Sequence, residues 1–359
     1  MTSNEIIMDG DVETESFDCM ATIRVKVNEK YIVTILKLAD RYEPLTAENL
    51  KDSLLPHQSI KMAENIIERY KTLGFIDDFG MLTELGKLAV EGEVYMPESG
   101  KYTICTTKNG FFPNPVVKIS RINSNENKEN TMKKPEILKV INPKPILVLL
   151  DGQKEEIIIE TIENQVQQSN SKDNFSIEVR SSGRYWNVNL KEHGKYHYEF
   201  QNSKLQIDDV WREITETKNL EWRGHPLQNG FALLAYKDTN INERKTFTRN
   251  IPKLTLNLDE FGTMEVRPIT VNIQPLSQRD ADLWSKDVII DRINDFTTVD
   301  NLKKISEEVK TKFKDHIPKN PDLDDLTKEM YNASLINKKG VPKEYWYLQA
   351  PIDLSMEVE

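Results

Sequence analysis

Two histidines four positions apart, His193 and His197, are the first residues whose types and spacing could support chemistry. On a helix this spacing would place both imidazoles on one face, as in some zinc sites. Gly194 and the neighbouring turn-forming residues favour a turn instead. No acidic or cysteine ligand stands at the spacing that a zinc site with three or four ligands requires. The sequence therefore predicts no metal ion at this position.

An acidic residue followed by a Glu-x-Lys triplet resembles the active-site pattern of metal-dependent nucleases. Asp208 or Asp209 would supply the acid, and Glu216 and Lys218 the triplet. Two-metal chemistry requires carboxylates that converge on a cleft, and the residues between these groups do not form a clear strand pattern. Such triplets also arise by chance where 30% of all residues are charged. A nuclease is therefore only the third hypothesis for this chain.

Motifs for nucleotides and cofactors are missing from the sequence as well. Gly86-Lys87-Leu88 and Gly100-Lys101-Tyr102 lack the hydroxyl residue that follows Gly-Lys in a phosphate-binding loop. We identify no catalytic residue, and we expect a protein that is not an enzyme and carries no cofactor.

The composition is typical of a soluble protein. It has 359 residues, enough for two or three domains, and a mean hydropathy of −0.57. No apolar run approaches the roughly 20 residues that span a bilayer, and the acidic N-terminus lacks the layout of a signal peptide. Two cysteines, Cys19 and Cys105, indicate a reducing compartment rather than a disulfide framework. We therefore expect a cytoplasmic protein that does not contact membranes.

Apolar residues recur at three- and four-residue steps within 30–92, as is typical of amphipathic helices. A first helix covers 31–39 and ends before Pro44, because proline cannot continue a helix. Thr46 caps a short second helix. A longer third helix ends at Gly74, which suits a helix C-terminus.

A tight hairpin and a last helix complete this stretch. The run Leu73-Gly74-Phe75-Ile76, a turn, and then Leu82-Thr83-Glu84-Leu85-Gly86-Lys87 resembles bacterial winged-helix proteins at the end of the recognition helix, the wing and the following helix. The resemblance covers roughly the N-terminal quarter of the chain. In that superfamily the third helix usually enters the major groove of DNA, and the wing contacts the DNA backbone. The resemblance thus implies these DNA-facing side chains: His57, Gln58, Ser59, Lys61, Asn65 and Arg69.

The net charge of this module argues against DNA. Residues 28–96 contain twelve acidic and eight basic side chains, a net charge of −4. Affinity for DNA depends largely on neutralising phosphates, so a DNA-binding face should be basic. Asp77 and Asp78 also occupy the predicted wing tip, where a DNA-binding wing would have Lys or Arg. Contact with double-stranded DNA and docking of another protein both remain open.

The most basic segment follows this module. Residues 97–144 contain nine basic and four acidic side chains, a net charge of +5. If nucleic acid binds anywhere, this strip is a better electrostatic candidate than the helix, and its members within strands and turns are Lys101, Lys108, Lys118 and Arg121. Solvated lysines at strand edges are the alternative interpretation.

The rest of the chain changes from short strands to helices. Strand patterns with regularly spaced turns predict an antiparallel sandwich or barrel. We therefore predict a multi-domain α+β protein with the following parts: a flexible acidic N-terminus (1–20), a winged-helix domain (21–96), strands that lead into the central domain (97–122), a flexible linker (123–135), a β-rich domain (136–275), a helical region (276–340) and a C-terminal tail (341–359).

These observations favour a non-catalytic adaptor or assembly subunit of a larger, DNA-related, bacterial complex. Its partner would be another protein subunit. The alternative is a regulator that binds double-stranded DNA through the winged helix and the basic 101–144 segment. The two hypotheses differ in what Lys61 and Arg69 contact.

Overall fold

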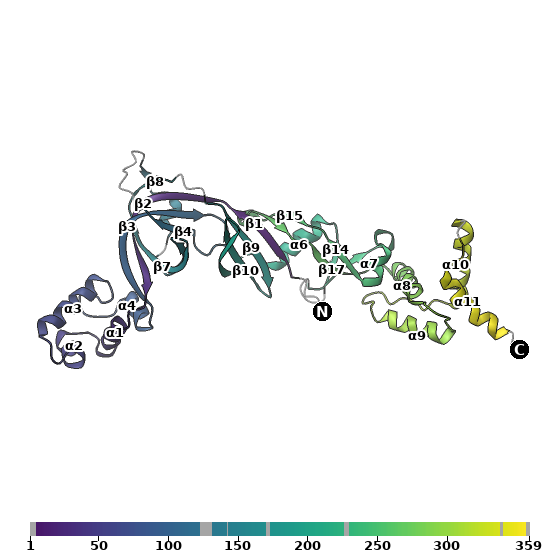
Figure 1. The fold of residues 1–359 in the computed structure, drawn as a ribbon, viewed down its shortest axis with the longest axis horizontal. Coiled ribbons are helices and arrows are strands. Elements are labelled where there is room, and N and C mark those ends of the chain that lie inside the picture. The colour runs from purple at the N-terminus through teal and green to yellow at the C-terminus, as the bar shows by residue number, and fades with distance from the viewer. Residues whose placement is uncertain are drawn as a thin grey trace.

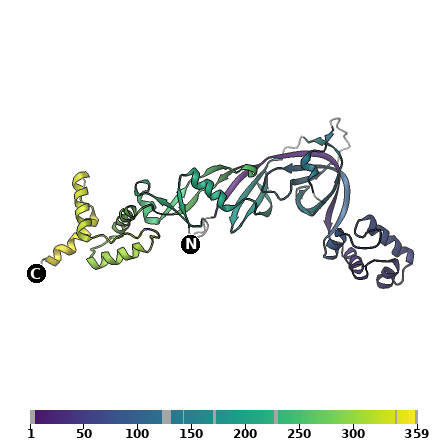
Figure 2. The same ribbon diagram turned by 180° about the vertical axis from the view of Figure 1, so that it is seen from behind.

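The computed structural model describes residues 5–122, 131–141, 143–169, 173–225, 230–337 and 340–356. These residues form eleven α-helices and seventeen β-strands, so the protein is mixed α+β with a β-rich centre. The molecule is elongated, with helices α1 to α4 at one end and helices α8 to α11 at the other (Figure 1). The view from behind shows the same order of parts (Figure 2). None of the described helices combines the length and the apolar character needed to cross a membrane.

A closed five-stranded barrel lies next to helices α1 to α4. Its strands follow one another around the barrel in the order β2 (Thr14–Val27), β3 (Val94–Thr107), β4 (Val116–Arg121), β6 (Ile146–Leu150) and β7 (Gln153–Ile162). β7 pairs with β2 to close the barrel, and all neighbouring pairs are antiparallel except β4 and β6. Alternate apolar side chains fill the barrel, as expected for strands with one buried face: Ile23, Ile104, Ile119, Val148 and Ile157 are among them.

The longest feature of the barrel is the ladder between β2 and β3. It runs without a register shift from the pair Thr14–Thr107 to the pair Val27–Val94. Four helices are inserted at its far end: α1 (Lys30–Tyr42), α2 (Ala47–Leu54), α3 (Ile60–Thr72) and α4 (Glu84–Val90). The four helices therefore connect β2 to β3 in the place where a simple hairpin would have its loop.

The inserted residues, 28–93, have a hydrophobic core of their own and are called the helical module below. Ile32, Leu36, Leu50, Ala63 and Phe75 belong to that core. Side chains of the expected capping type start three of its helices: Thr46 for α2, Ser59 for α3 and Thr83 for α4. The helices predicted within 30–92 are all present.

A six-stranded sheet follows the barrel, in the order β11 (Lys195–Asn202), β10 (Tyr185–Glu192), β9 (Phe175–Ser182), β1 (Ile7–Val12), β16 (Thr263–Val266) and β15 (Leu254–Asn257). It is called the second sheet below. Its core is continuous with that of α6 (Ile207–Thr217) and includes Trp186 and Trp211. Only Glu13 separates β1 from β2, so one run of chain serves the second sheet and then the barrel.

A smaller sheet leads towards the C-terminal helices. Its strands are β12 (Glu221–Arg223), β13 (Phe231–Leu234), β17 (Ile269–Pro275) and β14 (Thr248–Ile251), with α7 (Ile241–Thr246) beside it. The chain then forms α8 (Gln278–Arg292), α9 (Val299–Lys310), α10 (Leu323–Asn337) and α11 (Lys343–Met356). The helical region predicted from residue 276 is present. The predicted tail, 341–359, is mostly the helix α11, and residues 357–359 lie outside the described part.

Two of the predicted parts need correction. The flexible N-terminus, 1–20, is wrong for the residues described, because β1 and half of β2 occupy it. Ile6, Met8, Val12 and Phe17 are buried there, and the acidic residues between them hid the two-residue period of a strand. The boundary at residue 136 is also wrong, since β6 and β7 complete a barrel with strands from 14–27 and 94–121.

The predicted linker, 123–135, is described only in part. Residues 123–130 lie outside the described residues. Beyond them, β5 (Met132–Lys133) pairs with β8 (Gln165–Gln168), which itself pairs with β2. A short helix, α5 (Glu136–Lys139), follows directly.

Gly86 is a position in the helical module where only glycine fits. A Cβ on Gly86 of α4 would lie 2.1 Å from the carbonyl oxygen of Phe75 and 3.0 Å from Leu82. The helix can therefore pack against the preceding hairpin only without a side chain at this point.

We expect Gly86→Ala to lower the free energy of unfolding by about 1–3 kcal/mol, because backbone must move to admit the methyl group. Urea unfolding followed by circular dichroism measures this. Gly100→Ala is the matched control, since its Cβ would meet only ordinary contacts with Tyr102 at 3.6 Å or more. Equal stability of the two variants would contradict the packing argument.

Glu178 is the centre of a charge network on the second sheet. Its carboxylate accepts hydrogen bonds from Arg180 at 2.8 Å, Lys191 at 3.0 Å and Arg267 at 2.6 Å. Burial raises the pKa of Glu178, but the three cationic donors outweigh it and hold the pKa at about 2. Arg267 also pairs with Asp9, so the network ties β9, β10, β1 and the end of β16 together.

We expect Glu178→Gln to lower the free energy of unfolding at neutral pH by about 2 kcal/mol, after allowance for partial solvent screening. A carboxylate with a depressed pKa stabilises the fold above its unfolded pKa, and this contribution is lost as the pH falls from 4.5 towards 2. The difference between wild type and variant should therefore shrink over that range in urea unfolding at stepped pH. Glu199→Gln, at an exposed position of β11, is the control and should show no such dependence.

Candidate docking surface of the helical module

The outward face of α3 carries three of the predicted contact residues. Lys61, Asn65 and Arg69 lie at four-residue steps, so they form one stripe on the helix. All three are exposed. No hydrogen bond or ion pair engages their side chains within the described ranges of the chain. The structure thus brings these three together on a face that is open to a partner.

The residues before α3 divide into two kinds. Ser59 is the N-cap of α3, and its hydroxyl oxygen accepts a hydrogen bond from the Met62 amide at 3.3 Å. His57 and Gln58 are exposed in the turn between α2 and α3. Ser59 therefore has a structural role that its exposure alone would not indicate, while His57 and Gln58 are exposed next to the start of α3.

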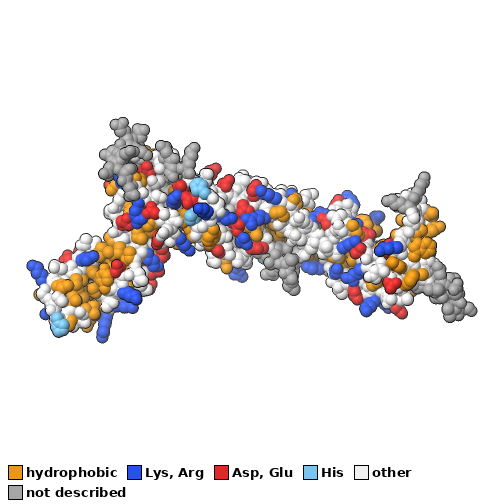
Figure 3. Space-filling view, in the orientation of Figure 1, with side chains coloured by type: hydrophobic (Ala, Val, Ile, Leu, Met, Phe, Trp, Pro, Cys, Tyr) orange, Lys and Arg blue, Asp and Glu red, His pale blue; other side chains and the backbone are white. Residues whose placement is uncertain are grey.

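Large apolar side chains are also exposed on the helical module. Phe79 is 83% exposed. Further members are 39–55% exposed: Tyr31, Tyr42, Leu54, Ile60 and Met62. Figure 3 shows hydrophobic side chains gathered over this end of the molecule. Exposed apolar surface of this kind is more typical of a protein contact than of a face that only water covers.

The most exposed of these side chains projects from a fixed turn. Asp77 accepts hydrogen bonds from the amides of Phe79 and Met81, both at 2.9 Å. Gly80 has a positive φ of 86°, and a Cβ there would lie 2.8 Å from the carbonyl oxygen of Leu45. The hairpin tip is thus anchored to the loop between α1 and α2, and Phe79 is held outward from it.

Lys118, one of the basic candidates, is engaged inside the protein. Its ammonium group pairs with Glu192 at 2.6 Å and with Asp173 at 3.1 Å, and only 18% of its side chain is exposed. Burial lowers the pKa of Lys118, but the hydrogen bonds that it donates to Glu192 and Asp173 outweigh this effect, so the pKa is raised. This lysine joins the barrel to the second sheet and is not available to a phosphate.

Arg121 is neutralised in a similar way. Its guanidinium group makes a bidentate pair with Glu98 at 2.7 and 2.8 Å, and it also pairs with Asp151. The pKa of Arg121 is raised, mainly by the hydrogen bonds that it donates to Glu98. Lys101 is half-buried in β3, and Lys108 is exposed beside a cleft that many acidic residues line. The four basic candidates therefore do not form one continuous positive surface.

The residue sets with possible catalytic chemistry do not converge. His193 lies in the turn after β10, while His197 lies in β11, 3.3 Å from Glu192. Asp208 and Glu216 lie in the first and last turns of α6, about 12 Å apart along the helix axis. In the described part of the chain, no three His, Cys, Asp or Glu residues are arranged to hold a metal ion. The geometry gives the nuclease hypothesis no support.

No model of a protein family matches this chain, and no characterised protein or solved structure is significantly similar to it. Its function must therefore be inferred from its own surface and chemistry.

None of the exposed apolar residues is among the contact residues predicted from the sequence. Phe79 falls in the predicted turn, and Met62 in the predicted third helix. One signal was present: an aromatic residue at the tip of a four-residue turn, between Asp78 and Gly80, cannot reach the core of its own hairpin.

We expect Lys118→Met to lower the free energy of unfolding by about 2–3 kcal/mol, because two partly buried carboxylates lose their shared cation. Urea unfolding at neutral pH measures this. Lys101→Met in the adjacent strand is the control, since Lys101 makes no ion pair within the described residues, and its effect should stay within about 0.5 kcal/mol. If Lys118→Met left the free energy of unfolding unchanged, Lys118 would be only a surface charge.

Proposed function

We propose that this protein is a non-catalytic adaptor or assembly subunit, and that its helical module is a winged helix that docks another protein. The observation that carries the proposal is the exposed apolar surface of the module, above all Phe79 at an acidic hairpin tip. A protein partner can bury such a surface more completely than the charged, hydrated backbone of DNA can.

The arrangement of the module supports a winged helix. Three helices precede a hairpin, in which an isolated bridge joins Ile76 and Leu82. The amide of Leu45, between α1 and α2, donates to the carbonyl oxygen of Gly80 at 2.9 Å. A short extended segment therefore lies beside the hairpin, as the wing of this superfamily would require, and α4 follows.

The charges on α3 support a protein partner. Glu64 and Glu68 are exposed on the same helix as Lys61 and Arg69, so the face is of mixed sign. Lys71 is already paired with Glu68 at 2.9 Å. With the net charge of −4 on the module, phosphate neutralisation would be weak here.

The attachment of the module supports a role in assembly. Arg24 of β2 donates to the carbonyl oxygen of Leu73, at the end of α3, at 2.7 Å. The same guanidinium group pairs with Glu160 of β7 at 3.0 Å. Because Arg24 is buried between the barrel and the module, the docking surface is held in a defined direction at one end of an elongated molecule (Figure 1). That arrangement suits a subunit that joins two others.

A second candidate function has one observation in its favour. The stripe of Lys61, Asn65 and Arg69 is unengaged and has the composition of a DNA-reading helix. A DNA-binding regulator is therefore the alternative, and substitutions can separate the two functions.

We expect Phe79→Ser to reduce recovery of a copurifying partner at least tenfold, since a well-packed aromatic anchor contributes at least 2 kcal/mol to a contact. Quantitative mass spectrometry after capture of the tagged protein, expressed at its native level, measures this. Tyr196→Ser, at an exposed position on β11, is the control and should leave the recovery unchanged.

DNA binding is measured on the same variants by fluorescence anisotropy with duplex DNA over a salt series. If the module docks a protein, the variants and the wild type should show no affinity for duplex DNA of the kind that falls steeply as the salt concentration rises. The DNA-binding alternative would be correct if the affinity for duplex DNA fell steeply with salt in the wild type and in Phe79→Ser. This binding would have to disappear in the double variant Lys61→Glu, Arg69→Glu.

A further inference from the structure

A cavity of about 390 Å³ lies between the barrel and the second sheet. The described residues that line it come from three parts of the chain: the loop 112–115 between β3 and β4, residues 140–141 and 144–147 before and at the start of β6, and Tyr198 and Phe200 of β11. Its volume falls in the range of sites that bind small molecules. None of the described lining residues belongs to the helical module, so binding of a ligand here does not depend on the proposed docking function.

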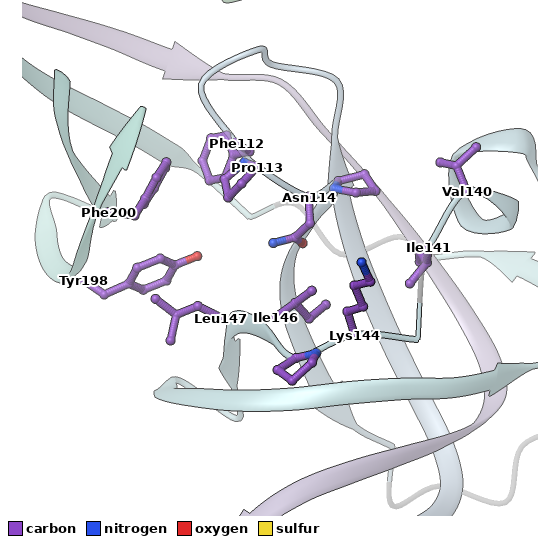
Figure 4. Close-up of a pocket in the computed structure, with 12 residues that line it drawn as sticks. Phe112, Pro113, Asn114, Val140, Ile141, Lys144, Ile146, Leu147, Tyr198 and Phe200 are labelled. Atoms are coloured by element: carbon purple, nitrogen blue, oxygen red, sulfur yellow. The ribbon is translucent and has the colours of Figure 1, made fainter. Parts of the chain in front are cut away.

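The walls of the cavity are mainly apolar. The rings of Phe112 and Phe200 lie 5.2 Å apart, and the ring of Tyr198 lies 5.9 Å from that of Phe200. Ile146 and Leu147 face them across the cavity (Figure 4). An apolar ligand body would thus meet aromatic rings on one side and aliphatic side chains on the other.

Tyr198 brings an unsatisfied hydroxyl group to this apolar space. The residue is only 3% exposed, and within the described part of the chain its hydroxyl has no hydrogen-bond partner. Burial alone raises the pKa of Tyr198, so the group is a neutral donor. Figure 4 shows the hydroxyl directed into the cavity. The hydroxyl group is therefore available to donate a hydrogen bond to an acceptor in the cavity.

Two further donors point to the same space. The side-chain oxygen of Asn114 accepts a hydrogen bond from the Val116 amide at 3.0 Å, which leaves its NH₂ group for the cavity. The side chain of Lys144 extends towards Asn114 (Figure 4). No Asp or Glu is among the described lining residues. Three donors therefore lie at the cavity, one of them the cationic and exposed Lys144.

We propose that this cavity binds a small molecule with an apolar body and one terminal carboxylate, such as a medium-chain fatty acid. The carboxylate accepts hydrogen bonds from Tyr198 and Asn114 and pairs with the ammonium group of Lys144. The apolar body packs between Phe112, Phe200 and Leu147. Because Lys144 is exposed, its charge favours an anionic ligand group over a neutral one, and it would repel a cationic one.

The test compares octanoate with two molecules of the same chain length, octanol and octylammonium, by isothermal titration calorimetry on the full chain. Octanoate should bind at least about tenfold more tightly than octanol, because a hydrogen bond to a charged group contributes about 1.5–3 kcal/mol. Octylammonium should show no heat of binding. Equal affinities for octanoate and octanol, or no binding of octanoate, would overturn the proposal.

Two substitutions locate the site. Tyr198→Phe keeps the ring and removes only the donor, so it should weaken octanoate about tenfold and octanol less. Lys144→Gln should abolish the preference for octanoate over octanol. Lys108→Gln, an exposed lysine away from the cavity, is the control for overall charge, and circular dichroism confirms that each variant is folded. Octanoate binding unchanged in both Tyr198→Phe and Lys144→Gln would show that the ligand sits elsewhere and would also overturn the proposal.

Discussion

The ladder between β2 and β3 is the interaction on which the rest of the molecule depends. Its two strands form two adjacent walls of the barrel, and their far ends carry the helical module. At the other end, the chain passes through Glu13 into β1 and so into the second sheet. One hydrogen-bonded ribbon therefore sets the direction of the helical module, the closure of the barrel and the attachment of the next sheet.

Local patterns in the sequence were sufficient to predict the helices of the helical module. Thr46, Ser59 and Thr83 cap its helices, and Gly74 follows the end of α3, so capping and periodicity within a dozen residues determined the outcome. The β-rich character of 136–275 was predicted for the same reason. The partners of its strands were not, because pairing is decided by contacts far apart in sequence. The pairing of Asp9 in β1 with Glu265 in β16 has no local signal at all.

The surfaces were harder to predict than the elements. Lys118 and Arg121 were sensible candidates by charge, yet the acids that neutralise them come from distant strands and loops, such as Glu192 for Lys118. The exposed state of Phe79 follows from the way the hairpin tip lies on the loop before α2. The cavity joins residues near 114, 144 and 198, none of which forms a motif with the others. In each case the information lies in tertiary contacts, which a single sequence does not display.

The pairing of β1 has a consequence for the order in which the chain can fold during synthesis. β2 can meet β3 once the first 107 residues exist, and β7 closes the barrel by residue 162. β1 must wait for β9 on one edge and, on the other, for β16, whose strand ends at Val266. The barrel and the helical module can thus form while β1 still lacks both neighbours. A ribosome-bound chain would then expose an extended N-terminal edge bearing Ile6, Met8 and Val12, and the acidic residues between them are well placed to keep that edge from pairing with other chains.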